Sequence, residues 1–265
     1  MLDSKYQRFY DEIVKKIKKE KIFTDKLHTL AYGTDASFYR LIPKIVIKTD
    51  NAKEVQDIIE LSNSLNLSIT FRAGGTSLSG QAISDSILVI TSRNFSNFKI
   101  APDASFISLQ PALTGAQVNG LLAKYSKKIG PDPASINAAM IGGIAANNAS
   151  GMCCGISQNS YKTLKSMKLI FADGAKLDTG CQESKDAFRK THGDFLKELK
   201  NFSNDTKNNE ELRAKIERKF KIKNTCGYSL NALIDFEDEF EILEHLIIGS
   251  EGTLAFIEEI TYYTV

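Results

Sequence analysis

Apolar positions in the first 100 residues change from a strand-like to a helical period and back, which predicts a β-α-β unit. Residues 44–48 alternate as a strand does, and Asn51 is a typical N-cap of a helix that continues to about Leu65. Two apolar runs, 67–71 and 87–90, predict further strands. We expect the first two strands to form a parallel pair with a right-handed crossover, and strand 87–90 to extend this small sheet.

The N-terminal segment, residues 3–20, carries apolar residues at helical spacing and lysines on the other faces. This pattern predicts one amphipathic helix. Such a helix can lie on a membrane surface, but a helix that docks its apolar face on a protein core has the same pattern, and we favour docking.

The second half of the chain predicts a larger mixed sheet with surface helices. Its segment 184–223 is rich in charge, which is typical of a solvated face, and we assign it no chemistry. The other predicted elements are a strand at 106–109, a helix that begins at Thr114 and buries Val118, Leu121, Leu122 and Tyr125, a hairpin over 164–179 with its turn at 172–174, two or three helices before residue 223 with a loop near 201–209, a helix over 240–248, and a strand that reaches the C-terminus.

The stretch from Arg72 to Gln81, Arg-Ala-Gly-Gly-Thr-Ser-Leu-Ser-Gly-Gln, is rich in glycine and hydroxyl residues. Glycines allow backbone N–H groups to point into one concavity, which suits a phosphate or pyrophosphate. The alternative is a strand-to-strand turn without a ligand. Gly75 and Gly80 have the spacing of a Walker loop, but Gln81 stands where that loop requires lysine, so an NTPase is not expected. The dinucleotide fingerprint Gly-x-Gly-x-x-Gly is absent as well.

A second unusual stretch covers residues 130–151 and combines two prolines, an Ala/Gly run and polar side chains. Its small residues permit a close approach of the backbone to a flat group, and Asn147, Asn148 and Ser150 can form hydrogen bonds with a polar ring edge. Tight packing of small residues in a core is the alternative. We favour a ligand, because polar side chains in a dry core are costly.

Composition narrows the function further. The chain has 265 residues, 42% hydrophobic and 25% charged, and a net charge of +2, which gives no reason to expect a nucleic-acid partner. It has no run of residues apolar and long enough to span a bilayer and no signal-peptide pattern, so a cytoplasmic location is expected. The four cysteines form no Cys-x-x-Cys pair, and we expect no metal site. For Cys153 and Cys154 we favour packing over reactivity.

Taken together, five segments resemble the FAD-binding domain shared by the vanillyl-alcohol oxidase and p-cresol methylhydroxylase flavoproteins. The similarity is greatest to the FAD-linked D-lactate dehydrogenase and glycolate oxidase branch, including members that also carry iron–sulfur clusters. The segments occur in the family's order and extend over nearly the whole chain. They are Tyr32–Arg40, Arg72–Gln81, Pro131–Gly151, Asn224–Leu233 and Gly249–Ile257.

The resemblance implies an α+β fold with two lobes and FAD between them. The small β-α-β lobe would cover about residues 1–102, and the larger mixed-sheet lobe with surface helices about residues 103–265. In some relatives a histidine after the two glycines bonds covalently to the flavin; here Thr76 stands at that position, so noncovalent FAD is implied. The implied cofactor-binding residues are Arg72, Ala73, Gly74, Gly75, Thr76, Ser77, Gly80, Gln81, Pro131, Ser135, Gly142, Gly143, Asn147, Asn148, Ser150, Gly151, Glu251, Gly252 and Ile257.

The implied reaction is oxidation of a 2-hydroxy acid such as D-lactate, with hydride transfer to the flavin N5. In the family the catalytic base lies mostly in a C-terminal cap, which we expect to be missing from this chain. We therefore name no catalytic residue and expect the chain alone to bind FAD without full activity. Electrons would pass to an iron–sulfur protein or a quinone, which allows a peripheral location on the inner face of the membrane.

Three other functions remain open at the level of sequence. The chain could be an electron-transfer subunit that carries FAD without a substrate site of its own. It could be related to UDP-N-acetylenolpyruvoylglucosamine reductase, although the stretch at Cys153 and the ending at Gly249–Ile257 fit that enzyme poorly. It could also be a binding protein without any cofactor, in which case the purified protein would be colourless.

Overall fold

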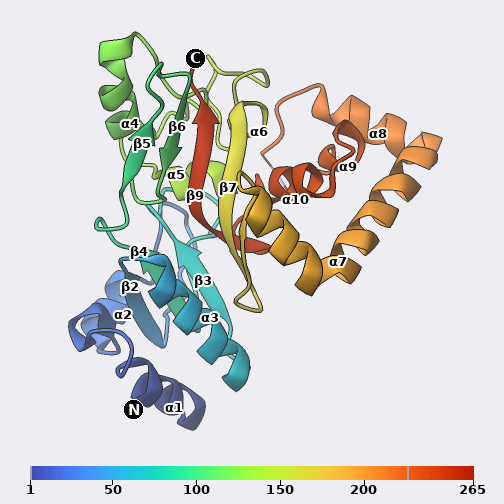
Figure 1. Ribbon diagram of the computed structural model, residues 1–265. Helices are drawn as coiled ribbons and strands as arrows, with labels where there is room; N and C mark the ends of the chain where they lie inside the picture. The colour runs from blue at the N-terminus through green and yellow to red at the C-terminus, as the bar shows by residue number, and fades with distance from the viewer. Residues whose placement is uncertain (1, 226) are drawn as a thin grey trace.

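The computed structural model describes residues 2–225 and 227–265 and contains two β-sheets (Figure 1). The first sheet has the order β1-β2-β4-β3, in which only β1 is antiparallel to its neighbour. The sequence places β4 at an edge of this sheet, and that prediction is wrong. All five residues of β4 are buried, whereas β3 is half-buried, so the more apolar strand occupies the centre. The strands are β1 (Ile22–Phe23), β2 (Ile45–Thr49), β3 (Ile69–Arg72) and β4 (Ile87–Thr91).

Helices of the first half pack on this sheet and include α1 (Ser4–Ile13), a 3₁₀ turn (Lys19–Lys21), α2 (Lys26–Ala31) and α3 (Ala52–Leu65). The predicted helix over 3–20 is too long. Ile17 is buried in the core, but it lies in a turn after α1. The apolar periodicity therefore continues beyond the end of the helix. Phe9 and Ile13 of α1 are fully buried, so the docked arrangement is confirmed. The N-cap of α3 is also confirmed, because Asn51 Oδ1 accepts the Glu54 N–H at 3.0 Å.

The second sheet is antiparallel throughout, in the order β5-β6-β9-β7-β8. Its central strand is the last one in the sequence, and Ile260 and Tyr262 are fully buried there. The predicted hairpin is confirmed, with Gly174 at φ +86° in the turn between β7 and β8. The strands are β5 (Phe98–Ile100), β6 (Phe106–Leu109), β7 (Leu164–Phe171), β8 (Lys176–Asp178) and β9 (Ala255–Tyr263).

Eight helical segments accompany the second sheet among the described residues: α4 (Gly115–Leu122), a 3₁₀ turn (Ala123–Tyr125), α5 (Ile141–Ala146), α6 (Ser160–Thr163), α7 (Gln182–Asn208), α8 (Glu210–Phe220), α9 (Ala232–Asp235) and α10 (Glu239–Ile247). The loop predicted near 201–209 is wrong, because α7 kinks at His192 and then continues to Asn208. Its polar residue Ser203 is buried and donates to the Leu233 carbonyl at 2.6 Å. Tyr125, predicted to be buried, is exposed.

A third apolar cluster joins the two sheets. Phe71 at the end of β3 packs on Phe256 at the start of β9, with ring centroids 4.9 Å apart, and Phe95 packs on the other side of Phe256. Figure 1 shows the first sheet at one end of the molecule and the second at the other, with α7 to α10 to one side. The glycine-rich loop therefore leaves β3 at the junction between the sheets.

Candidate functional site

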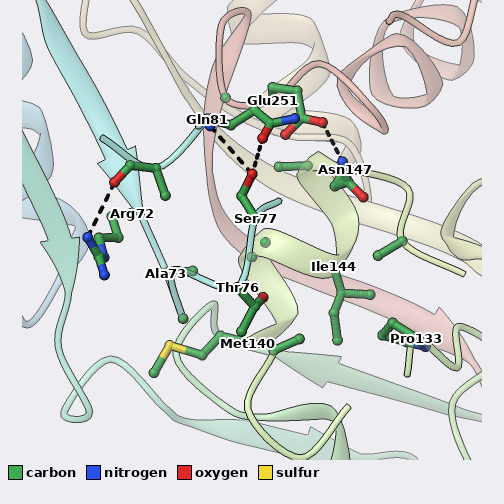
Figure 2. Close-up of a pocket in the computed structure, with 18 of the residues that line it drawn as sticks. Arg72, Ala73, Thr76, Ser77, Gln81, Pro133, Met140, Ile144, Asn147 and Glu251 are labelled. Atoms are coloured by element: carbon green, nitrogen blue, oxygen red, sulfur yellow. Dashed lines mark hydrogen bonds between the residues drawn. The ribbon is translucent and has the colours of Figure 1, made fainter. Parts of the chain in front are cut away.

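A cavity of about 650 Å³ lies at this junction, within the size range typical of cofactor sites. The glycine loop after β3, the helix α5 with its flanking residues and the turn before β9 form its walls (Figure 2). Lys223, Thr225 and Gly227 complete the lining. All of these except the glycine loop come from the second half of the chain, so the cavity exists only once the two sheets pack together.

The glycine loop presents backbone N–H groups that have no partner. In residues 2–225 and 227–265 no acceptor is found for the N–H groups of residues 75 to 78. Gly75 has φ +65°, and a Cβ built on it would lie 2.5 Å from Arg72 Nη2. Unpaired N–H groups are costly unless a ligand or water accepts from them. Consecutive free donors on a loop with a left-handed residue form an anion-binding nest.

Small residues bring α5 against this loop. A Cβ on Gly74 would lie 2.6 Å from the Ala138 carbonyl oxygen, and one on Gly143 would lie 3.6 Å from Ala73 Cβ. Side chains at these positions would push the loop and the helix apart. The two glycines therefore set the width of the cavity.

Arg72 does not direct its charge into the cavity. Its guanidinium donates from Nη1 to the carbonyl oxygens of Thr34, at 2.7 Å, and of Tyr32, at 3.3 Å. Burial lowers the pKa of this guanidinium. Arg72 thus fixes the loop around residues 32–34 against the glycine loop, and anion binding rests on backbone N–H groups.

The turn before β9 carries one acidic side chain, Glu251, into the cavity. Glu251 Oε1 accepts a hydrogen bond from Asn147 Nδ2 at 2.5 Å, and its backbone N–H donates to the Ala146 carbonyl at 2.8 Å. The second bond caps the C-terminus of α5. Burial raises the pKa of the Glu251 carboxyl, while hydrogen bonds from Asn147 and Gln81 oppose that rise.

Two buried polar atoms near the C-terminus of α5 have no partner in the described residues, Asn148 Oδ1 and Ser150 Oγ. Ser150 lines the cavity, and its carbonyl accepts a hydrogen bond from Lys223 Nζ. A buried hydroxyl without a partner costs free energy, which a ligand in the cavity can recover.

The structure gathers most of the sequence-predicted cofactor residues in this one cavity. Those that line it are Arg72, Ala73, Gly74, Gly75, Thr76, Ser77, Gln81, Ser135, Gly142, Gly143, Asn147, Ser150, Glu251, Gly252 and Ile257. The others, Gly80, Pro131, Asn148 and Gly151, are not among the lining residues. Gly80, at φ +79°, and Gly151, whose Cβ would lie 1.6 Å from the Asp132 carbonyl oxygen, are required by the backbone itself.

Sequence reasoning missed several lining residues. Lys223 is the last residue of the charge-rich segment, where no sequence signal distinguishes a cavity lysine from a solvated one, and Thr225 lies just after it in the segment Asn224–Leu233. Packing is confirmed for Cys154, which is fully buried, and is wrong for Cys153, which is exposed; Cys226 lies outside the described residues. Within the described residues no cluster of side chains is suited to hold a metal ion.

Comparison with known proteins identifies the family. Residues 43–180, more than half of the chain, match the FAD binding domain family, and the chain belongs to that family. FAD is accordingly its cofactor, and the free N–H groups of the glycine loop fit the pyrophosphate of FAD. The resemblance found in the sequence is confirmed.

Relatives named for enzymes cover most of this chain. It is 28% identical over 90% of its length to D-2-hydroxyglutarate dehydrogenase from Haemophilus influenzae and covers 24% of that protein. It is 25% identical over 82% of its length to D-lactate dehydrogenase from Archaeoglobus fulgidus and covers 38% of that protein. A solved alkyldihydroxyacetonephosphate synthase shares the fold, with a TM-score of 0.65 at 17% identity over 98% of this chain and 41% of the other. The chain thus spans a quarter to two fifths of these proteins.

Proposed function

We propose that this chain is the FAD-binding part of a flavin-dependent dehydrogenase that oxidises a 2-hydroxy acid. The observation that carries the proposal is the glycine loop, whose N–H groups from Gly75 to Leu78 find no acceptor in the described part of the chain and line a cavity at the sheet junction. The relatives' names, which include D-2-hydroxyglutarate and D-lactate dehydrogenases, support the substrate class. Bound FAD would supply the hydride acceptor, its N5.

In this proposal the chain's residues bind and orient the cofactor. The backbone of the glycine loop accommodates the pyrophosphate, with Thr76 as an additional hydroxyl donor. The glycines Gly142 and Gly143 of α5 allow the close approach of a flat ring, and Asn147 and Ser150 bond to polar atoms at its edge. The remaining sequence-predicted residues contact the rest of the cofactor or support the backbone. FAD is held noncovalently, because Thr76 stands at the position of the linking histidine.

We further propose that substrate binding and proton abstraction depend on protein outside this sequence. The two lobes would be residues 1–102 and 103–265, and a cap, in the same or another chain, would hold the 2-hydroxy acid and supply the catalytic base. An iron–sulfur protein or a quinone would take the electrons. In the described parts of the chain no helix is long and apolar enough to cross a membrane, and a peripheral location stays a prediction.

The visible absorption spectrum of the purified chain, before and after acid precipitation, tests this proposal. We expect a flavin spectrum and complete release of the flavin into the supernatant. Flavin retained in the pellet would contradict noncovalent binding. A colourless protein that takes up no added FAD would overturn the proposed function. With FAD bound, anaerobic addition of D-lactate or D-2-hydroxyglutarate should leave the flavin oxidised, because the base is expected elsewhere.

A further inference from the structure

Glu251 occupies an unfavourable backbone conformation at the wall of the cavity. Its φ is +55°, in the left-handed region that residues other than glycine rarely adopt. The two other positive φ angles in this turn belong to glycines, Gly249 and Gly252. Such a conformation is unfavourable for a residue with a Cβ. A glycine would satisfy the backbone of this turn, so the carboxyl group itself is the feature that needs an explanation.

The carboxyl group connects two elements that form opposite walls of the cavity. From α5, Asn147 Nδ2 donates to Glu251 Oε1 at 2.5 Å. From the glycine loop, the Gln81 side chain acts on the same carboxyl group, since a hydrogen bond from it lowers the pKa of Glu251. Figure 2 shows Gln81, Glu251 and Asn147 in a row across the top of the cavity.

The hydrogen bonds continue from Gln81 into the glycine loop. The Ser77 hydroxyl donates to Gln81 Oε1, and its oxygen accepts from the backbone N–H groups of Ser79, at 3.2 Å, and Gln81, at 3.4 Å (Figure 2). With Gln81 Oε1 occupied by this hydroxyl, the amide NH₂ is left to donate to Glu251. The donors therefore run in one direction, from Ser77 through Gln81 to the carboxylate, where Asn147 meets them.

No ion pair competes for this carboxyl group. Among the described lining residues Glu251 is the sole acidic one, and the cations there are Arg72 and Lys223. Arg72 donates to the carbonyls of Tyr32 and Thr34, and Lys223 donates to the Ser150 carbonyl. The carboxylate therefore has two amide donors, Asn147 and Gln81. Replacing the carboxylate with an amide would leave one of these donors without an acceptor.

We propose that Glu251 is a positioning residue that links the glycine loop to the C-terminus of α5 and holds both in the orientation that FAD binding requires. This inference rests on the proposed binding of FAD and assigns Glu251 an organising role toward Gln81 and Asn147. It predicts that FAD affinity depends on the order of hydrogen-bond donors and acceptors from Ser77 to Asn147. A different residue at position 251 should be tolerated when that order is preserved.

A charge exchange between positions 81 and 251 tests this prediction. Glu251→Gln leaves one amide without an acceptor and should weaken FAD binding about tenfold, the equivalent of one hydrogen bond to a charged group. Gln81→Glu places two carboxylates against each other and should weaken it more.

The double variant Gln81→Glu/Glu251→Gln restores each hydrogen bond. The Ser77 hydroxyl and the new amide at position 251 both donate to the new carboxylate at position 81, and Asn147 donates to the amide oxygen at position 251. FAD affinity should therefore return to within about threefold of the unmodified protein.

The dissociation constant of FAD, measured by quenching of flavin fluorescence, is the first readout. The second needs no cofactor: amide hydrogen exchange at positions 79 and 81, whose N–H groups donate to the Ser77 oxygen, should become faster in both single variants of the FAD-free protein and recover in the double variant. If a variant at 251 does not fold, Asn147→Ala removes the other donor and should loosen the α5 end in the same exchange experiment.

The matched control is Glu244→Gln, which changes a buried carboxyl group that does not line the cavity. It should alter neither the FAD affinity nor the exchange at positions 79 and 81. An unmodified protein that does not bind FAD would refute the proposed function. Tight FAD binding that Glu251→Gln leaves unchanged, or a double variant no better than Gln81→Glu, would refute the role of Glu251 and leave the proposed function intact.

Discussion

Two polar regions of this protein differ in whether their groups are paired. Under α10, Tyr161 donates to Asp235 at 2.8 Å, His245 Nδ1 lies 2.7 Å from the Glu241 carbonyl, and the Glu244 carboxyl meets the Thr179 hydroxyl. At the cavity, the N–H groups of residues 75 to 78 and the Ser150 hydroxyl have no partner among the described residues.

The difference separates polar groups that stabilise the fold from polar groups that are free to bind a ligand. Glu244 and His245 are buried, and burial shifts their pKa values: that of Glu244 rises to about 7 and that of His245 falls to about 4. Both shifts favour the neutral form, which a packed core tolerates. A strongly shifted pKa is often a sign of an active site, but here the unpaired donors indicate the site better.

The largest loss of FAD affinity is expected from a substitution at Gly75. Gly75→Val should lower FAD affinity at least about a hundredfold, because a β-branched residue is disfavoured at φ +65° and its Cβ would meet the Arg72 guanidinium. Flavin titration measures the loss. Gly120→Ala in α4, where a Cβ meets no atom within 4 Å, is the control and should retain full affinity. Full flavin occupancy in the valine variant would contradict the assignment of the glycine loop.

The buried carboxyl group of Glu244 makes the free energy of unfolding depend on pH. Below pH 4.5 both folded and unfolded states keep its proton; as the pH rises to about 7, only the unfolded state releases it, so the free energy of unfolding falls. Glu244→Gln removes this loss and should stabilise the protein by roughly 2–3 kcal/mol at pH 8 and little at pH 4.5. Chemical denaturation at both pH values measures the difference. Equal stabilisation at the two would show that the carboxyl is not held neutral.

The smallest effects come from a pair of buried serines. Ser150→Ala should leave stability within about 0.5 kcal/mol, since its hydroxyl is unpaired, and should weaken FAD binding about threefold to tenfold. Ser203→Ala should do the opposite: it removes the bond to the Leu233 carbonyl, costs about 1 kcal/mol of stability, and leaves FAD affinity unchanged. Denaturation and flavin titration of both variants decide whether pairing separates the two regions. The same effect of both serines on FAD affinity would contradict it.

Elements with strong local signals could be predicted from the sequence. Three such features depend on neighbours within four residues: the N-cap at Asn51, the capping box of Thr114 and Gln117 at the start of α4, and the turn at Gly174. Each appears as predicted or at a predicted boundary. The glycine loop was evident for the same reason. A stretch of glycine, serine and threonine between two strands predicts a phosphate loop without knowledge of what lies opposite, although a turn without a ligand has the same local pattern.

What faces that loop depends on long-range packing. The central place of β4, the lysine at 223 and the direction of Arg72 depend on segments far apart in the sequence, and no local pattern encodes them. The same is true of the link from Gln81 through Glu251 to Asn147, which joins three segments that are distant along the chain. A hydrogen bond between distant residues forms only after packing has brought its two partners within about 3 Å of each other.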